Sequence, residues 1–221
     1  MGLEKIIFSW SGGKDSALAL YQILQSGDYE VCALLTTLNE SYDRICMHGV
    51  RQALLNAQSE SIGIPLEKIY LTPSATNEEY DSKMRDELDR AKDRGITAVA
   101  FGDIFLEDLR QYRVERLSQA GMKGIFPIWK RPSSELALAF IRLGFKAVIA
   151  CVDSQALDKS FAGREFDEKF LSDLPQAVDP CGENGEFHTF VYEGPLLQRP
   201  VVHKKGEVVF RDNRFYFCDL L

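Results

Sequence analysis

The residues best suited to chemistry form one short string, Ser11-Gly12-Gly13-Lys14-Asp15-Ser16. Its two glycines allow a tight turn and leave no side chain between the backbone and a ligand. An apolar run, residues 6–10, precedes the string, and a helix-like run, residues 17–24, follows it. A strand, a turn and a helix in that order bring main-chain N–H groups and a helix N-terminus to one point. The string therefore predicts a phosphate-binding turn.

Two hydroxyls, one ammonium and one carboxylate complete this string. Ser11 and Ser16 add hydroxyl donors, and Lys14 adds a positive charge. Asp15 is the unexpected member, because a carboxylate repels phosphate unless a cation such as Mg²⁺ lies between them. The string therefore predicts Mg²⁺ as a cofactor and Asp15 as its ligand.

The glycine spacing excludes the two commonest nucleotide loops. The P-loop needs four residues between its first glycine and a Gly-Lys-Ser/Thr ending, whereas Gly12 and Gly13 are adjacent. The dinucleotide-binding fingerprint needs the spacing Gly-x-Gly-x-x-Gly, which the string also lacks. The string resembles instead the pyrophosphate-binding loop of the adenine nucleotide alpha hydrolase superfamily. That resemblance implies ATP as the nucleotide and cleavage between its alpha and beta phosphates. A generic glycine turn before a helix is the alternative.

A second cluster of polar side chains occupies residues 181–190. It places Glu183, Asn184, Glu186 and His188 around two glycines. Flexible backbone beside several polar side chains suits a loop that recognises a substrate. A solvated turn before a strand is the alternative that these residues leave open.

Together the two motifs resemble the diphthine–ammonia ligase family. The late motif reads Gly-Glu-x-Gly-Glu-Phe-x-Thr-Phe-Val over residues 182–191, and Trp129-x-Arg131 and Gly102-Asp103-Ile104 also fit the family's pattern. The resemblance spans the chain from the first motif to about Pro195.

The late motif departs from the ligase pattern at two positions. Asn184 stands where the diphthamide enzymes carry glycine, and His188 stands where they carry glutamate. An imidazole in place of a carboxylate changes what a pocket prefers. This form looks like the family's bacterial branch, for which a role in corrinoid salvage has been suggested, so a corrinoid-salvage amidoligase is an alternative to diphthine amidation.

The resemblance implies a reaction, partners and a division of the chain. ATP adenylates a carboxylate, pyrophosphate leaves, and ammonia displaces AMP to form an amide. The implied partners are a small-molecule or protein-borne carboxylate and ammonia or an ammonia-donating protein, and a homodimer is compatible with the sequence. Residues 1–128 would form an ATP-binding domain of Rossmann-like fold, and residues 129–221 a smaller substrate-binding domain.

The resemblance also implies roles for single residues. The beta and gamma phosphates would be held by Ser11, Gly12, Gly13 and Ser16. Lys14 would neutralise charge at the alpha phosphate, and Asp15 would hold Mg²⁺. The adenine and ribose would contact Thr36, Thr37 and Gly102. Asp103 would contact the ribose or Mg²⁺, or would be only a turn or helix-capping aspartate.

The second substrate is assigned to the late motif and to the domain junction. The residues assigned to it are Glu183, Asn184, Gly185, Glu186, Thr189, Trp129 and Arg131. Either Glu186 or His188 could take a proton from the attacking amine. A packed strand histidine and a buried tryptophan between domains are the alternatives for His188 and Trp129.

Three arginines, Arg110, Arg113 and Arg116, follow Gly102 within one helical stretch. They could bind an anionic substrate or AMP. The alternative, which their spacing favours, is surface ion pairing with Glu107 and Glu115.

The elements that must position these residues alternate between strand and helix. The fold class predicted is α/β, a Rossmann-like parallel sheet with helices on both faces, followed by a smaller α+β domain. Strands are expected at residues 5–9, 31–37, 68–72, 97–101, 124–128, 146–152, 186–192, 200–203, 207–211 and 215–218. Helices are expected at residues 16–25, 47–61, 77–94, 107–119, 133–143 and 164–173. Ser133 is the expected N-terminal cap of the fifth of these helices. Hairpin turns are expected at residues 204–206 and 212–213.

The polar clusters at residues 11–16, 36–39 and 102–103 each follow a predicted strand. Ligands bind at the carboxyl ends of the strands in such sheets. We therefore expect these three clusters to converge on one crevice.

The composition fits an ordinary globular protein and argues against nucleic acid as a partner. The chain has 221 residues, 45% hydrophobic content and a formal net charge of −7. No run is long enough to span a membrane and no secretory pattern precedes the first strand, which predicts a cytoplasmic protein.

Two further functions share the first motif. A tRNA-modifying enzyme that transfers sulfur would need catalytic cysteines and a basic face, whereas Cys46 and Cys151 are unpaired in sequence and the charge is negative. A non-catalytic adenine nucleotide sensor is the other alternative.

Overall fold

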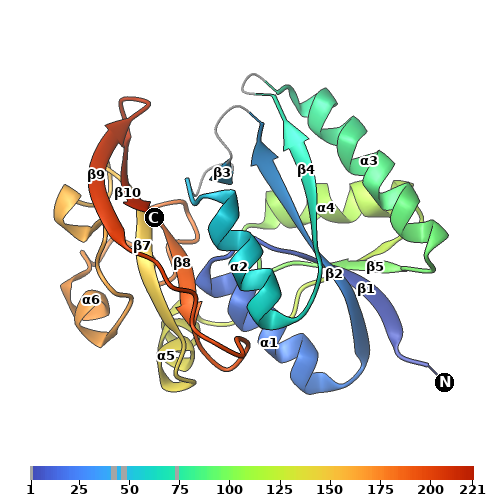
Figure 1. The fold of residues 1–221 in the computed structure, drawn as a ribbon, viewed down its shortest axis with the longest axis horizontal. Coiled ribbons are helices and arrows are strands. Elements are labelled where there is room, and N and C mark those ends of the chain that lie inside the picture. Colours follow the sequence, from blue (N-terminus) through green and yellow to red (C-terminus); the bar gives the residue numbers. More distant parts are fainter. Residues whose placement is uncertain (1, 41–43, 46–48, 73–74) are drawn as a thin grey trace.

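The computed structural model describes residues 2–40, 44–45, 49–72 and 75–221, and it contains two sheets (Figure 1). The first, six-stranded sheet comprises β1 (Glu4–Ser9), β2 (Tyr29–Asn39), β3 (Arg44–Ile45), β4 (Leu66–Leu71), β5 (Ala98–Ala100) and β6 (Lys123–Ile125). Its helices are α1 (Lys14–Ser26), α2 (Gln52–Ile62), α3 (Asn77–Asp93) and α4 (Glu107–Gln119). The second, four-stranded sheet comprises β7 (Lys146–Asp153), β8 (Phe187–Glu193), β9 (Lys205–Arg211) and β10 (Phe215–Leu220). The remaining elements are α5 (Ser133–Arg142), a 3₁₀ turn at Lys159–Phe161 and α6 (Glu168–Asp173).

The strand order of the first sheet creates a crevice. The order is β3-β2-β1-β5-β6, and β4 also pairs with β2. Every pairing is parallel except that of β2 with the two-residue β3. The chain proceeds outward from β1 in one direction through β2 and β4, and in the other through β5 and β6. Ligands bind where the strand order reverses in this way, which here is between the carboxyl ends of β1 and β5.

Helices cover both faces of this sheet, as the alternating strand and helix patterns predict. Ile6 and Phe8 pack with residues of α1 and α2, whereas Ile7 lies in a second core with residues of α3 and α4. Successive side chains of a strand point to opposite faces, so a strand covered on both faces is an unbroken apolar run. The predicted α/β fold class is confirmed.

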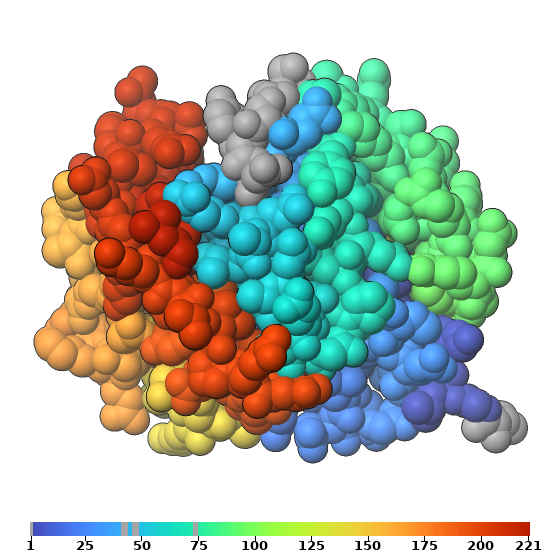
Figure 2. Space-filling view, in the orientation of Figure 1, coloured from blue at the N-terminus to red at the C-terminus, as the bar shows by residue number. Residues whose placement is uncertain are grey.

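The second sheet is antiparallel, with the order β8-β7-β10-β9, and its core is continuous with the α1 and α2 side of the first sheet. Figure 2 shows the segment that precedes β9 lying on α2. Three hydrogen bonds to Ser61 hold it there. Gln198 N donates to the carbonyl of Ser61, and the Ser61 hydroxyl donates to the carbonyl of Arg199 over 2.5 Å and accepts from Arg199 N over 3.1 Å.

Most predicted elements are present, and the errors concern short segments. The turn at Asp212 and Asn213 is confirmed, since both residues have positive φ, as a tight hairpin turn requires. The turn expected at residues 204–206 is wrong because β9 already begins at Lys205, and residues 200–203 do not form a strand.

Helix α1 begins at Lys14, two residues before its predicted start, and three other predicted helices differ in their cap or their first residue. Pro132, and not Ser133, occupies the cap position of α5. The helix expected from residue 164 begins at Glu168, because Asp167 caps it by accepting from Phe170 N. The helix expected from Met47 begins at Gln52, and Met47 itself lies outside the described residues. Within the described part of the chain, no helix has the length and apolar character needed to cross a membrane.

Candidate functional site

The glycine turn connects β1 to α1. Gly12 has φ +74°, and a Cβ there would lie 2.7 Å from the Gln58 side-chain oxygen, so only glycine fits. The Ser11 hydroxyl accepts from Gly13 N and donates to the Ser16 hydroxyl over 3.0 Å. The Ser16 hydroxyl in turn donates to the carbonyl of Gly13 over 2.9 Å. Both serines therefore shape the turn, as well as placing hydroxyl groups at it.

The amides of this turn are open to a ligand. Among the described residues, none accepts a hydrogen bond from the main-chain N–H of Gly12, Asp15 or Ser16. Gly102, which follows β5, packs against this point, and a Cβ on it would lie 2.9 Å from Ser16 N. Its missing side chain therefore allows the backbone after β5 to pack closely against the first turn of α1. Unsatisfied amides at a helix N-terminus form an anion site.

Lys14 points from the turn toward the second sheet. Its ammonium lies 2.7 Å from Asp15 Oδ2, donates to the carbonyl of Cys181, and sits over the rings of Phe166 and Phe187. Burial is the largest influence and lowers the pKa of Lys14, but the attraction of Asp15, Cys181 and Glu183 and the hydrogen bond to Asp15 together outweigh it, so the pKa is raised. Lys14 is therefore a buried cation that ties the turn to the late motif, and its role at the alpha phosphate stays a prediction.

Three carboxylates converge beside the turn. Burial raises the pKa of Asp15, although the Lys14 ammonium opposes the rise. Burial also raises the pKa of Asp103, Arg113 opposes the rise, and Asp15 adds to it. Burial raises the pKa of Glu183 to about 7, and the charges of Asp15 and Asp103 contribute. The Glu183 carboxylate accepts from Ile104 N over 2.7 Å, so the late motif reaches the segment after β5.

Asp103 has spare bonding capacity. It is 9% exposed, and its Oδ2 lies 3.0 Å from Arg113 Nε, yet neither buried atom makes a well-directed hydrogen bond within the described residues. Mg²⁺ prefers carboxylate and phosphate oxygens and keeps part of its water shell. In the described part of the chain no three acidic, histidine or cysteine side chains form a ready metal site. A Mg²⁺ ion held by Asp15 and Asp103 would therefore need phosphate oxygens and water as its further ligands.

A large cavity opens from the turn over the α3 and α4 face of the sheet. Its volume is about 1030 Å³, which is at the upper end for small-molecule sites. Ser11, Thr36, Thr37, Phe101 and His188 are among the residues that line it. The sequence expected residues 36–39 to follow a strand, but β2 extends to Asn39, so the two threonines lie within the strand. The structure nonetheless brings them to one crevice with the turn.

The late motif is organised by its own acidic side chains. The Glu186 carboxylate accepts from Asp179 N, Asn184 N and the Asn184 side-chain amide, each over 3.0 Å. Gly185 N donates to the carbonyl of Gly182. Glu186 is buried, and these bonds occupy it within its own loop. Its predicted role as a proton acceptor is therefore less well supported by the geometry than a role in shaping the loop.

His188 and Thr189 are the second and third residues of β8. Burial lowers the pKa of His188 to about 4, and the Lys14 charge adds to this, so the imidazole is neutral near pH 7. The Thr189 hydroxyl accepts from Lys14 N over 2.9 Å and is only 2% exposed. His188 faces the cavity, whereas Thr189 faces the turn.

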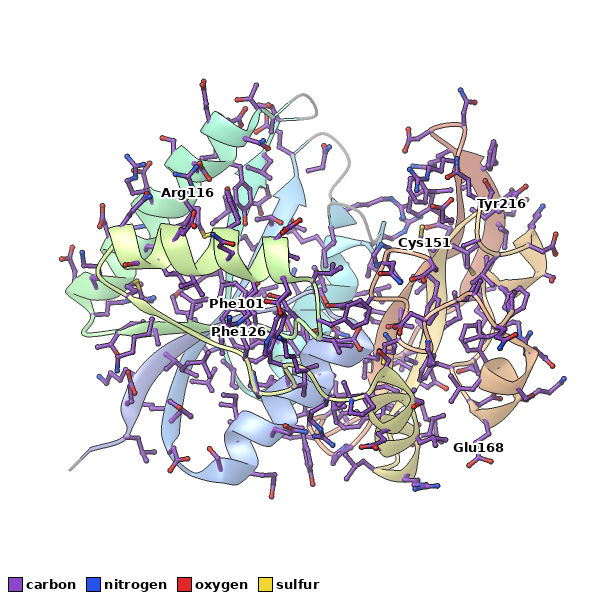
Figure 3. All side chains as sticks on the ribbon, turned by 180° about the vertical axis from the view of Figure 1, so that it is seen from behind. Phe101, Arg116, Phe126, Cys151, Glu168 and Tyr216 are labelled. Atoms are coloured by element: carbon purple, nitrogen blue, oxygen red, sulfur yellow. The ribbon has the colours of Figure 1, made fainter. Side chains whose placement is uncertain are left out.

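Aromatic rings and arginines alternate behind the crevice. The Phe101 and Phe126 rings stack with their centroids 5.4 Å apart, and both residues are labelled in Figure 3. The Arg110 guanidinium lies 5.0 Å from the rings of both Phe126 and Trp129, and the Arg113 guanidinium lies 4.3 Å from the Phe101 ring. Trp129 is thus packed by an arginine, which supports the packing alternative.

The three arginines do not pair as their spacing favours. Arg113 pairs with Asp103, and Arg116 pairs with Asp81 at 2.7 Å. The prediction of pairs with Glu107 and Glu115 is wrong, because helix α4 turns these arginines toward the crevice and α3. Glu107 pairs with Lys130 instead, and Glu115 accepts from Gln111. Arg131 lies beside the Gln22 amide on α1.

Gln58 is a site residue that the sequence analysis missed. It is fully buried on α2, its oxygen accepts from the Trp10 indole over 3.0 Å, and its amide nitrogen donates to the carbonyls of Gly12 and Val191 over 3.0 and 2.6 Å. The sequence contains a signal for Gln58, because it lies four positions after Leu54 and so on the apolar face of the predicted helix, where a polar side chain is unexpected.

The cysteines give little support to sulfur transfer. Cys151 is buried, and desolvation raises the pKa of its thiol to about 12. Desolvation also raises the pKa of the buried Cys181. Thiolates are the reactive species, so these thiols are poor candidates. Cys46 lies outside the described residues.

Comparison with known proteins gives a consistent result. The family model of the diphthamide synthase N-terminal domain matches residues 4–124, and that of the diphthamide synthase C-terminal domain matches residues 133–218. A protein named diphthine–ammonia ligase in Schizosaccharomyces pombe is 28% identical over 93% of this chain, which spans 37% of that protein. Proteins of the same name in Danio rerio and Homo sapiens are each 24% identical, over 92% and 90% of this chain and 88% and 82% of their own length.

Proposed function

The chain belongs to the diphthamide synthase family, and from this premise we propose that it is an ATP-dependent ligase that forms an amide from a carboxylate and ammonia. The observation that carries the proposal is the glycine turn after β1, because the amides of Gly12, Asp15 and Ser16 have no hydrogen-bond acceptor among the described residues and Ser11 lines the cavity. The relatives' name supports the reaction type, and the turn supports the nucleotide.

In the proposed binding mode, the turn holds the pyrophosphate part of ATP. The amides of residues 12–16 and the hydroxyls of Ser11 and Ser16 contact the beta and gamma phosphates, and the adenosine enters the cavity beside Thr36 and Thr37. Mg²⁺, when bound by Asp15 and Asp103, neutralises phosphate charge. The buried Lys14 ammonium keeps Asp15 in place and adds positive potential at the turn.

The proposed reaction has two steps. A substrate carboxylate oxygen attacks the alpha phosphorus, and the bond between that phosphorus and the oxygen bridging to the beta phosphate breaks, which releases pyrophosphate. The nitrogen of ammonia then attacks the acyl carbon, AMP leaves with its oxygen, and the nitrogen loses one proton. Glu183, whose pKa of about 7 suits proton transfer near neutral pH, accepts that proton in place of Glu186 or His188.

Two observations bear on which carboxylate is the substrate. The relatives' name indicates diphthine, whereas Asn184 and His188 alter the late motif. We assign residues 1–128 to ATP and residues 129–221 to the second substrate, with Glu183 and Asn184 nearest to it. Asn184 is exposed at the rim of its loop, where a bound substrate can contact it.

The experiment supplies ATP, Mg²⁺, ammonium and a panel of carboxylates to the purified protein, and identifies the nucleotide products. The panel contains an elongation factor that bears diphthine, corrinoid acids and simple acids. We expect AMP and pyrophosphate in equal amounts with one class of acid. ADP and phosphate would contradict the proposal, and a thiolated tRNA formed with a sulfur donor would replace it.

A further inference from the structure

The free edge of strand β8 lies against the glycine turn. β8 is an edge strand of the second sheet and pairs only with β7 among the described strands, so its other edge carries unpaired main-chain groups. Val191 N uses this edge to donate to the carbonyl of Gly12 over 2.9 Å. Gly13 permits the approach, because a Cβ there would lie 3.2 Å from the carbonyl oxygen of Thr189.

Thr189 is the β8 side chain that reaches the turn. Its hydroxyl accepts from Lys14 N over 2.9 Å, although the two residues are 175 positions apart. The opposite strand contains an irregularity at this step, since Ile149 pairs with Thr189 and Cys151 pairs with His188, which leaves Ala150 as an extra residue. Bulges of this kind change the direction of neighbouring side chains and are common beside functional sites.

Gln58 connects the same two segments from the other side. Its amide nitrogen donates both to the carbonyl of Gly12 in the turn and to the carbonyl of Val191 in β8. Thr189 and Gln58 are both buried, so water cannot easily replace these bonds. The turn is therefore held by contacts from outside its own sequence as well as by its own serines.

We propose that Thr189 is a positioning residue for the nucleotide, an inference that rests on the proposed function. Its hydroxyl fixes the first amide of α1, at Lys14, so that the next amides, at Asp15 and Ser16, stay directed at the phosphates. The second sheet is then part of the nucleotide site as well as of the substrate site. Thr189 is consequently not a contact of the second substrate, to which the sequence had assigned it.

The test compares Thr189→Val, which keeps the shape and removes the hydroxyl, with Thr189→Ser, which keeps the hydroxyl. Thr97→Val is the matched control, because the Thr97 hydroxyl bonds only to Glu4 on the surface among the described residues. For each protein we measure the Kd for ATP with Mg²⁺ by calorimetry, the melting temperature, and hydrogen exchange of the amides of residues 11–16 without nucleotide.

We expect Thr189→Val to raise the Kd for ATP about tenfold and to speed exchange of the Lys14 amide, because a buried donor loses its acceptor. Thr189→Ser should stay within about twofold of wild type, as should Thr97→Val. A Thr189→Val protein with wild-type Kd and wild-type exchange would overturn the inference, and so would equal losses in the valine and serine variants. If the wild type binds no ATP, the proposed function fails, while the exchange data still decide whether Thr189 holds the turn.

Discussion

Replacing Glu183 with glutamine should remove the pH dependence of turnover. The pKa of Glu183 is raised to about 7 by burial, so about a tenth of the carboxyl is ionised at pH 6 and about nine tenths at pH 8. If the carboxylate accepts the proton of the nucleophile, the wild-type rate rises about ninefold over this interval at saturating ammonium. The side-chain oxygen of the introduced glutamine can still accept from Ile104 N, so the loop should keep its geometry.

The assay is amide formation against pH, at saturating ATP and ammonium, for wild type and Glu183→Gln. We expect the variant to be slower by a factor of about 10² or more at pH 8 and to show no rise between pH 6 and 8. Glu168→Gln is the matched control, because Glu168 is exposed on α6, far from the crevice in Figure 3. A flat wild-type profile, or a variant that keeps the rise, would refute the role of Glu183.

The same substitution should change stability with a defined sign. The pKa of Glu183 is higher in the folded protein than its ordinary value of 4.5, so the folded state favours the protonated carboxyl, and wild-type stability falls as pH rises through about 7. A rise of this size corresponds to about 3 kcal/mol for a fully buried carboxyl, and partial solvent access reduces it to about 1–2 kcal/mol. In urea unfolding, Glu183→Gln should exceed wild type by that amount at pH 8 but not at pH 4. A difference that does not depend on pH would contradict the assigned pKa.

Three further substitutions test the turn and its supports. Gly102→Ala places a Cβ 2.9 Å from Ser16 N and should raise the Kd for ATP at least about tenfold, as measured by calorimetry. A variant that binds ATP with wild-type affinity would show that the Ser16 amide is not used. Gln58→Leu leaves the buried carbonyls of Gly12 and Val191 without this donor and should lower the free energy of unfolding, measured in urea, by about 3–5 kcal/mol. A loss below about 1 kcal/mol would contradict the bridging role of Gln58. Lys14→Met leaves a buried Asp15 carboxylate uncompensated and should cost about 3–5 kcal/mol at pH 8. The loss should shrink as the pH is lowered, because burial raises the pKa of Asp15 and favours its protonated form, so a loss that does not change with pH would argue against the buried ion pair.

Local patterns in the sequence were sufficient for the turn and for the elements of the first sheet except the two-residue β3, which was not predicted. The 107–119 helix begins and ends at the predicted residues, and the string at residues 11–16 forms the predicted strand–turn–helix connection. These features depend on periodicity and on glycine, which are visible within a few residues.

The contacts that shape the site could not be predicted in the same way. Thr189 with Lys14, Glu183 with Ile104, and Gln58 with Val191 join residues that are 79 to 175 positions apart. Such contacts depend on how the second sheet packs against the first, which no local pattern specifies. The charge pattern of α4 likewise favoured pairs within the helix, whereas Arg113 pairs with Asp103, which lies in the connection before that helix.

The central claim is that the amides of the glycine turn bind the phosphates of ATP, and a crystal structure with α,β-methylene-ATP and Mg²⁺ tests it most directly. The account predicts beta and gamma phosphate oxygens within hydrogen-bond distance of the amides of residues 12–16, with the adenosine in the cavity beside Thr36 and Thr37. An analogue bound elsewhere, with the turn unoccupied, would contradict it.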